Sequence, residues 1–256
     1  MADMTVNGTD ISADNGASLL DYVIGQTPIT NTIFQGVNNS QWTHLFSEFG
    51  LREIYITIVF SGPTLRAAKY ARSRFNLQVY SECELYIPDD GFYYRCSCME
   101  LGDEELVGIG DDEAQIKSRY HFQGIRHGEL DTKAQTSIGG DVQFTCTATA
   151  PKTACRLEVP VAVGETTMQI THRVDGVALA TVRLSDLPGD TTYTAVIDGL
   201  ARTVTVGTNW LAKTVWTGAP SPYFYIVPGI NKFEIVTYGA TASERTVTLK
   251  YYPVYL

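Results

Sequence analysis

The chain has 256 residues, of which 44% are hydrophobic and 18% charged, and its formal net charge is -9 at pH 7. This length suits one large all-β domain or two smaller ones, and the hydrophobic content is ordinary for a folded globular protein. The surplus of acidic residues argues against nucleic acid as the main partner, because binding to phosphates needs a basic face.

The first residues carry no sign of a targeting segment. Residues 1–18 are polar and contain Asp3, Asp10 and Asp14, without the apolar core and basic start of a secretory signal. No apolar run approaches the roughly 20 residues of a membrane span. We therefore expect the chain to be made and folded in a cytoplasm, without association with a membrane.

Residues 4–49 predict only short elements. A short strand is followed by a turn at Asn7-Gly8 and a polar stretch, and a small apolar cluster lies between Leu19 and Ile24. Residues 44–49 are apolar and aromatic and lead into the next strand. We expect part of this region to pack against a neighbouring subunit instead of forming a core of its own.

The most regular pattern of the chain begins at Arg52. Residues 52–60 alternate, with isoleucines and Phe60 on one face, which is typical of a half-buried strand. Ser61 is a suitable N-cap and Pro63 is tolerated in a first helical turn, so a short helix is predicted over residues 63–76. Alternation then returns in two further strands, over residues 77–87 and 92–98, which are separated by the turn signal Pro88-Asp89-Asp90-Gly91.

The segment after Cys98 mixes acidic loops with strands. The acids between Asp103 and Glu113 lack the ligand spacing of an EF-hand, so we expect a solvated loop. Strands are predicted over residues 115–124 and 142–148, with a polar, glycine-bearing loop over residues 128–140 between them. His121 and His127 flank the first of these strands and are expected to be structural, because no serine or cysteine nucleophile accompanies them.

The residue types that carry chemistry do not form a recognisable reactive set. The five cysteines are expected to be reduced thiols, mostly buried, and Cys96-Ser97-Cys98 lacks the second ligand pair of a zinc site. A hydrolase would need paired carboxylates, such as Glu53 with Glu82 or Glu84, but nothing in the sequence places them in one cleft. We expect no enzyme activity and no catalytic, cofactor-binding or metal-binding residues.

The pattern of the sequence changes near Ala150-Pro151. This change predicts a first domain over residues 1–150 and a second over residues 151–256. Beyond this point short strands recur about every 8–12 residues, the spacing of a β-sandwich, with hairpin signals at Asp175-Gly176 and Asp198-Gly199. The apolar last strand is expected to pair with a sheet, and a return to the first domain is one option.

Four aromatic residues of the second half are candidates for contact with glycans, because aromatic faces can stack on sugar rings. The competing interpretation places the same side chains in the sandwich core, where large aromatic rings dominate packing. The four residues are Trp210, Trp216, Tyr223 and Tyr225.

The order of these features resembles the distal tail proteins of long-tailed, non-contractile bacteriophages. Residues 52–60 with the following helix are similar to the strand–helix pair of that family's N-terminal domain, and Leu85–Tyr94 to its next hairpin. Val196-Ile197-Asp198-Gly199, residues 204–207 and residues 225–231 are similar to its C-terminal sandwich. The resemblance extends over most of residues 50–256.

The resemblance implies a mainly β fold, with a ring-forming N-terminal domain that carries one short helix and a galectin-like C-terminal sandwich. It implies a structural protein of the virion tail tip or baseplate, assembled in the bacterial cytoplasm. A homo-oligomeric ring, expected to be a hexamer, would join the tail tube to the hub or fibre protein and to receptor-binding proteins for host attachment. Acids between Asp103 and Glu113 would line the lumen and repel DNA in transit. The alternative function is a carbohydrate-binding sandwich that contacts host-surface glycans.

Overall fold

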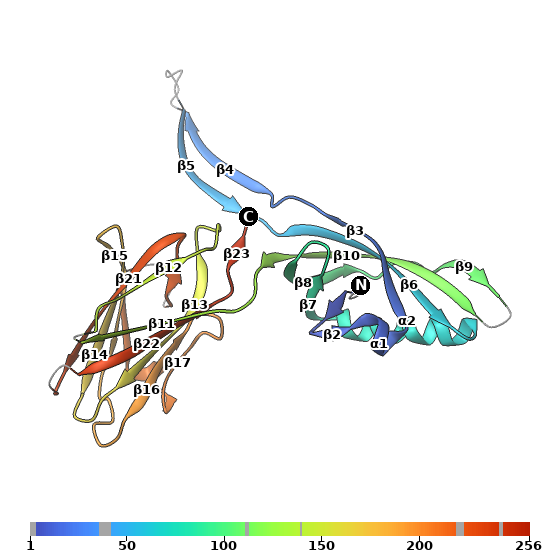
Figure 1. Ribbon diagram of the computed structural model, residues 1–256. Helices are drawn as coiled ribbons and strands as arrows, with labels where there is room; N and C mark the ends of the chain where they lie inside the picture. The colour runs from blue at the N-terminus through green and yellow to red at the C-terminus, as the bar shows by residue number, and fades with distance from the viewer. Residues whose placement is uncertain (1–3, 36–41, 111–112, 139, 219–222, 241–242) are drawn as a thin grey trace. The chain divides into compact units, whose positions relative to one another are not determined.

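The chain is mostly β and divides into two compact units (Figure 1). The computed structural model describes residues 4–35, 42–110, 113–138, 140–218, 223–240 and 243–256. The first unit runs to His127 and also includes Leu256, and the second covers residues 128–255. Among the helices of the described residues, none combines the length and the apolar character that crossing a membrane requires.

The first unit is built on one antiparallel sheet with the strand order β2-β1-β7-β8-β10-β6-β3, and β9 pairs with β10 beside β8. β4 and β5 form a separate two-stranded sheet. The elements are β1 (Thr5–Val6), β2 (Thr9–Asp10), α1 (Ile11–Asn15), β3 (Ala17–Ile24), β4 (Ile29–Gln35), β5 (Trp42–Phe49), β6 (Arg52–Gly62), α2 (Leu65–Val79), β7 (Glu82–Ile87), β8 (Phe92–Glu100), β9 (Glu105–Ile109) and β10 (Ala114–His127).

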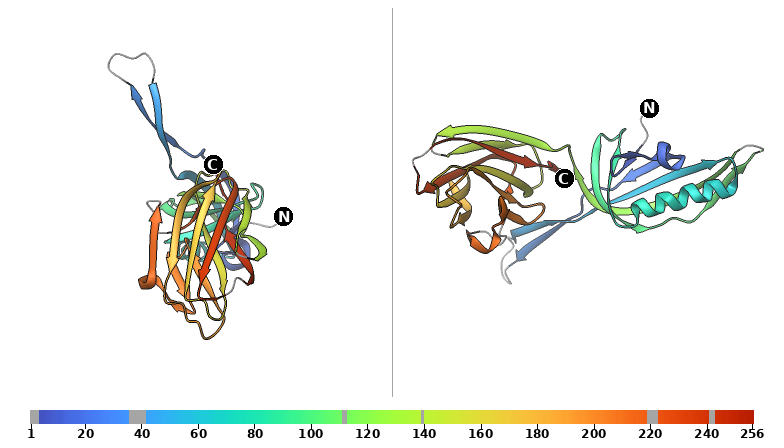
Figure 2. Two further views of the ribbon diagram at one scale, coloured as in Figure 1. Left: turned by 90° about the vertical axis from the view of Figure 1, so that its left-hand side faces the viewer. Right: turned by 90° about the horizontal axis from the view of Figure 1, so that it is seen from below.

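The core of the first unit lies between the sheet and α2, which runs lengthwise along the strands (Figure 2). The predicted alternation of residues 52–60 is confirmed, because Ile54 and Phe60 and the isoleucines between them are fully buried. Phe75 of α2 packs edge-on against Phe60, at 5.7 Å between ring centroids, and against Tyr120 of β10, at 5.0 Å. Alternation in β6 and helical spacing in α2 thus bury their apolar faces against each other.

The helix begins and ends later than the sequence predicts, and the strand expected from residue 77 begins at Glu82 instead. Ser61 and Gly62 belong to β6, because the pairing with β10 continues as far as Gly62 opposite Ala114. Thr64 is the N-cap instead, and its hydroxyl accepts a hydrogen bond from the backbone N–H of Ala67 at 3.2 Å. The predicted cap at Ser61 was therefore wrong, since Thr64 offers the same chemistry after the strand has ended.

Several elements of the first unit were not predicted, among them the strands β3, β4, β5 and β9 and the helix α1. The one-turn helix α1 is capped by Asp10, whose carboxylate accepts from the backbone N–H of Ser12 at 2.7 Å. The strand β9 lies in the segment that was expected to be a solvated acidic loop, and all of its residues are exposed. α1 and β9 are both short and depend on pairing or packing with the rest of the unit.

The second unit consists of two antiparallel sheets that share one hydrophobic core. One sheet has the order β11-β22-β13-β16-β17-β18, with β20 on β13, and the other has the order β12-β21-β14-β15-β19. The elements are β11 (Asp131–Ile138), β12 (Val142–Cys146), β13 (Thr153–Val161), β14 (Thr167–Val174), β15 (Val177–Leu184), β16 (Tyr193–Asp198), β17 (Thr203–Val206), β18 (Thr208–Asn209), the 3-10 helix η1 (Leu211–Lys213), β19 (Thr214–Gly218), β20 (Tyr225–Ile226), β21 (Gly229–Tyr238), β22 (Glu244–Tyr251) and β23 (Val254–Tyr255).

The hairpin signal at Asp175-Gly176 is confirmed. Val174 pairs with Val177 across a two-residue loop, and φ is +50° at Asp175 and +80° at Gly176. Two positive φ values define the turn type that matches the right-handed twist of the flanking strands. The turn therefore sets the register of β14 against β15.

The two units separate earlier in the sequence than the candidate boundary at residue 150. β11 and β12 precede that boundary, yet they pair with β22 and β21 of the second unit. The predicted loop over residues 128–140 was wrong for the same reason, because β11 becomes a strand by pairing with β22. At the other end of the chain Leu256 belongs to the first unit, and its backbone carbonyl accepts a hydrogen bond from Arg126 at 3.1 Å.

Candidate functional site

The carboxylates that a hydrolase would need are hydrogen-bonded to neighbouring side chains or lie too far from one another to act as a pair. The carboxylate of Glu53 binds His121 and Gln123, whereas Glu82 and Glu84 lie on β7. Two strands separate β6 from β7 in the sheet, which places these carboxylates roughly 14 Å apart, beyond the roughly 5–9.5 Å of glycosidase pairs. No group of three metal-ligating side chains occurs among the residues that the structure describes.

In the part of the chain that the structure describes, the sheet of the first unit has open edges at β2, β3 and β9, of which β3 and β9 are apolar. Within the described residues β3 pairs only with β6, and β9 only with β10. Each of the two strands carries apolar side chains that are more than half exposed: Leu20 and Val23 on β3, and Leu106, Val107 and Ile109 on β9. An apolar strand edge exposed in this way is a site for pairing with another chain.

The face of this sheet opposite α2 is polar and partly exposed. Tyr55 stacks on His121 with 4.6 Å between the ring centroids, and the guanidinium of Arg119 lies 5.0 Å from the Tyr55 ring. Hydrogen bonds from His121 and Gln123 lower the pKa of Glu53. His121 thus has a structural partner, as expected, and the cluster offers a charged, ordered surface without a nucleophile.

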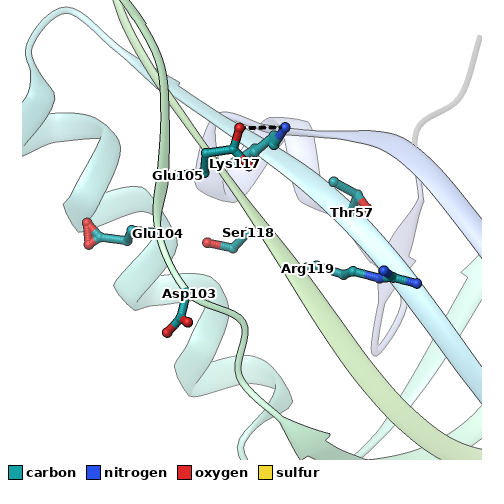
Figure 3. Close-up of a pocket in the computed structure, with 7 residues that line it drawn as sticks. All are labelled: Thr57, Asp103, Glu104, Glu105, Lys117, Ser118 and Arg119. Carbon is teal, nitrogen blue, oxygen red and sulfur yellow. Dashed lines mark ion pairs between the residues drawn. The ribbon is translucent and has the colours of Figure 1, made fainter.

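A cavity of about 410 Å³ lies where the segment between β8 and β9 passes close to β10 (Figure 3). A Cβ on Gly102 would clash with the carbonyl oxygen of Arg119, so this close approach of the two backbones requires glycine. Arg72 of α2 donates to Gly102 and, at 2.8 Å, to Ser118. The cavity is lined by Thr57, Asp103, Glu104, Glu105, Lys117, Ser118 and Arg119.

Most charges at this cavity are neutralised within the unit. Lys69 lies 3.1 Å from Glu104, and Lys117 lies 2.8 Å from Glu105. The first ion pair connects the segment before β9 to α2, and the second connects β9 to β10, so the charges at the cavity hold these elements together. Of the other acids expected in a lumen, Asp111 and Asp112 lie outside the described residues.

The outward face of α2 is apolar and basic. Tyr70, Leu77 and Tyr80, the last of which is the C-cap, are 66%, 79% and 81% exposed. Arg66 and Arg74 lie on the same face, and neither takes part in an ion pair among the described residues. Exposed large side chains that gather on one face mark an interaction surface more often than isolated ones do.

The four aromatic residues singled out for glycan contact lie in different surroundings. Tyr223 is buried, and its hydroxyl donates to the backbone carbonyl of Arg202. Trp210 and Trp216 are partly buried against the core, and Trp210 Nε1 donates to the carbonyl of Ser185 at 2.9 Å. Tyr225 is partly exposed on β20. The structure therefore places three of the four in packing contacts, and their contact with sugars stays a prediction.

A second cavity, of about 360 Å³, lies on the outer face of the sheet that contains β12, β21 and β14. Arg173 Nε lies 2.7 Å from Glu234, and Lys232 lies 3.2 Å from the same carboxylate and 2.9 Å from Asp141. The hydrogen bond from Arg173 lowers the pKa of Glu234. The sequence contained no signal for this group, because its members come from β14, from β21 and from the residue before β12, which are distant along the chain.

The fold and its surfaces define a class of protein: a two-unit, mostly β chain with open strand edges, exposed apolar faces and no recognisable set of catalytic residues among those described. No family model matches the sequence, and no curated protein sequence matches it.

Solved structures do match, over nearly the whole chain. The Dit protein of phage SPP1, described as a paradigm of the hub adsorption apparatus in phages that infect Gram-positive bacteria, has a TM-score of 0.67 at 10% identity, with 97% of each chain covered. A chain of the phage p2 baseplate in its activated conformation with Ca has a TM-score of 0.54 at 10% identity, covering 94% of this chain and 92% of that one. The corresponding structure with Sr has a TM-score of 0.54 at 10% identity, covering 96% and 97%. The chain therefore shares its fold with the SPP1 Dit protein and with a chain of the p2 baseplate.

Proposed function

We propose that this chain is a structural component of a phage tail tip, which acts by assembling with copies of itself and with other tail proteins. The likeness in fold to the SPP1 hub protein, over 97% of both chains, supports this proposal. The observation that carries it is the pair of open, apolar strand edges in the first unit.

The direction of the strands makes these edges suitable for a ring. β9 is antiparallel to β10, β10 to β6, and β6 to β3, so β3 and β9 run in opposite directions. A second copy turned about an axis parallel to the strands would present its β9 to β3 as an antiparallel neighbour. Repeated head-to-tail contacts of this kind close into a ring when a full circle is a whole multiple of the rotation between neighbouring copies.

The β4–β5 sheet supports the same proposal. Its two strands pair with each other over residues 29–35 and 42–49, and with no other strand among the described residues. A two-stranded sheet is marginally stable by itself in water. A neighbouring subunit in the ring would stabilise it, in line with the expectation from the sequence for this region.

The remaining parts of the proposal concern the assembled particle. The ring is proposed to be a hexamer at the virion tail tip that joins the tail tube to a hub or fibre protein. The basic, apolar face of α2, with Tyr70, Leu77 and Tyr80, is a surface for such partners. Receptor-binding proteins would attach through the second unit, and DNA would pass through the lumen.

The test is the mass of the particle that the purified chain forms. We expect mass photometry and negative-stain microscopy to show a ring of one size. Leu20→Lys and Val107→Lys should shift the mass to that of a monomer, because lysine on an edge opposes strand pairing. Val163→Lys is the matched control, since Val163 is equally exposed in the second unit. If both edge variants keep the ring mass, these edges are not the interface.

A second candidate function, binding of host-surface carbohydrate, is favoured by the cavity beside Arg173, Lys232 and Glu234. Its volume is at the small end of the roughly 300–1,000 Å³ of ligand sites, and its paired charges present both donors and acceptors to sugar hydroxyls. The test is binding of the full chain to a glycan array. Binding that is lost in Glu234→Gln and kept in Arg183→Met would support this function. If binding depends on Tyr225 and not on Glu234, the glycan site lies at the aromatic residues and not at this cavity.

A further inference from the structure

Two cysteines of the first unit face each other across the β7–β8 hairpin. Cys83 and Cys96 are directly opposite in the strand register, and their sulfur atoms are 3.8 Å apart. Both thiols are free, and each residue is 3% exposed. Directly opposite residues of an antiparallel pair have Cα atoms about 4.5–5.5 Å apart, within the range of about 4.4–6.8 Å that a disulfide needs.

The other three cysteines have different neighbours. The sulfur of Cys98 contacts the backbone carbonyl of Glu100 at 3.4 Å, and that of Cys155 contacts the carbonyl of Phe224 at 3.6 Å. Cys146 lies on β12 of the second unit. Cys83 and Cys96 are the pair for which the structure gives a direct contact between the two sulfur atoms.

The contact between the two sulfur atoms also makes the two thiols differ in acidity. The thiol of Cys96 can donate a hydrogen bond to the thiolate of Cys83, and this lowers the pKa of Cys83. The same contact, together with burial, raises the pKa of Cys96. Because the thiolate is the reactive form, Cys83 is the member of this pair that reacts first with a small oxidant.

We propose that Cys83 and Cys96 are a modification site, a dithiol that a peroxide converts into a cross-strand disulfide. The thiolate of Cys83 attacks hydrogen peroxide, the O–O bond breaks, and Cys83 becomes a sulfenic acid while hydroxide leaves and takes up a proton. The sulfur of Cys96 then attacks the sulfur of Cys83, which forms the S–S bond and releases the second water. Two thiols lose two electrons and one peroxide is reduced to two waters.

A small oxidant suits the burial of the pair, because each residue is 3% exposed and little room is left for a larger reagent. The bond would close a loop that includes the turn at residues 88–91, and thereby restrict the unfolded state of the hairpin. If the chain is a tail-tip protein, as proposed above, the oxidation would follow release from the reducing cytoplasm, where such disulfides are rare. The chemistry of the pair itself does not depend on that function.

The experiment uses the full-length protein treated with hydrogen peroxide and digested with trypsin without reduction. Cleavage after Arg95 separates the two cysteines, so a disulfide links the peptide 75–95 to the peptide 96–117 in the mass spectrum. We expect this linked species in the wild type and in Cys98→Ser, which removes the other thiol of the second peptide. It should be absent in Cys96→Ser.

A second measurement keeps the result independent of the stability of any one variant. The oxidised wild-type protein should unfold at a higher urea concentration than the same protein after dithiothreitol, and Cys98→Ser should keep this difference. Cys83→Ala replaces Cys96→Ser if the latter does not fold. A linkage through Cys98, or oxidation of Cys83 and Cys96 to sulfinic acids without a crosslink, would overturn the proposal. Ring assembly is measured separately, so a failure here leaves the proposed function standing.

Discussion

Glu165 and Arg245 of the second unit form an ion pair that is almost fully removed from solvent, with side-chain exposures of 0% and 4%. The other carboxylate oxygen of Glu165 accepts a hydrogen bond from the backbone N–H of Ala162 at 2.9 Å. Arg245 also donates to the carbonyl of Pro160 at 3.3 Å. The pair therefore connects β22 to the end of β13 and the turn that follows it.

The expected cost of breaking this pair follows from its burial. In Glu165→Gln the guanidinium of Arg245 would keep its charge in a buried site without a carboxylate, and such a loss destabilises a protein by about 3–5 kcal/mol. Arg245→Met should cost a similar amount, because it leaves the carboxylate buried alone. The double variant carries neither charge, so its loss should be smaller than the sum of the two single losses by about 0.5–3 kcal/mol.

The assay is urea denaturation followed by tryptophan fluorescence. Trp210 and Trp216 pack against the core of the second unit, and a Trp42→Phe background removes the tryptophan of the first unit. Arg183→Met is the matched control, since Arg183 is exposed on β15 and has no ion pair among the described residues. If Glu165→Gln shifts the unfolding midpoint no further than Arg183→Met does, the reasoning about the buried charge is wrong.

Three further results are expected. Burial lowers the pKa of His172, against a smaller opposing effect of its hydrogen bond to Asn231. The unfolded chain then binds the proton more tightly, so the stability of the second unit should fall as the pH drops below about 6.5, and His172→Gln should flatten this dependence in urea midpoints. Phe75→Ala should destabilise the first unit by about 3–5 kcal/mol in circular dichroism melts, because the ring is fully buried; no loss would contradict the packing. Ellman's reagent should titrate Cys98 before the other thiols in the native protein, since the other four cysteines are buried, and rapid reaction of all five would contradict their burial.

Local patterns predicted much of the scaffold. The alternation from Arg52 to Phe60 identified β6 and its buried face, since a strand with one face in the core must alternate. The Asp175-Gly176 signal located the β14–β15 hairpin because few dipeptides tolerate two positive φ values. The helix α2 was predicted by its apolar spacing, although its cap was misplaced by three residues. The mostly β fold of the chain was also predicted correctly.

Properties that depend on partners distant along the chain were decided by the tertiary structure. β11 is polar and resembles a loop, yet it is a strand because β22 supplies its hydrogen bonds. β9 became a strand, and an open edge, only by lying beside β10. The contact of Cys83 with Cys96 likewise depends on the register of a hairpin. A single sequence shows which secondary structure each segment prefers. Whether a segment becomes a strand also depends on the neighbouring backbone with which it can form hydrogen bonds. That neighbour is determined only when the whole chain has folded.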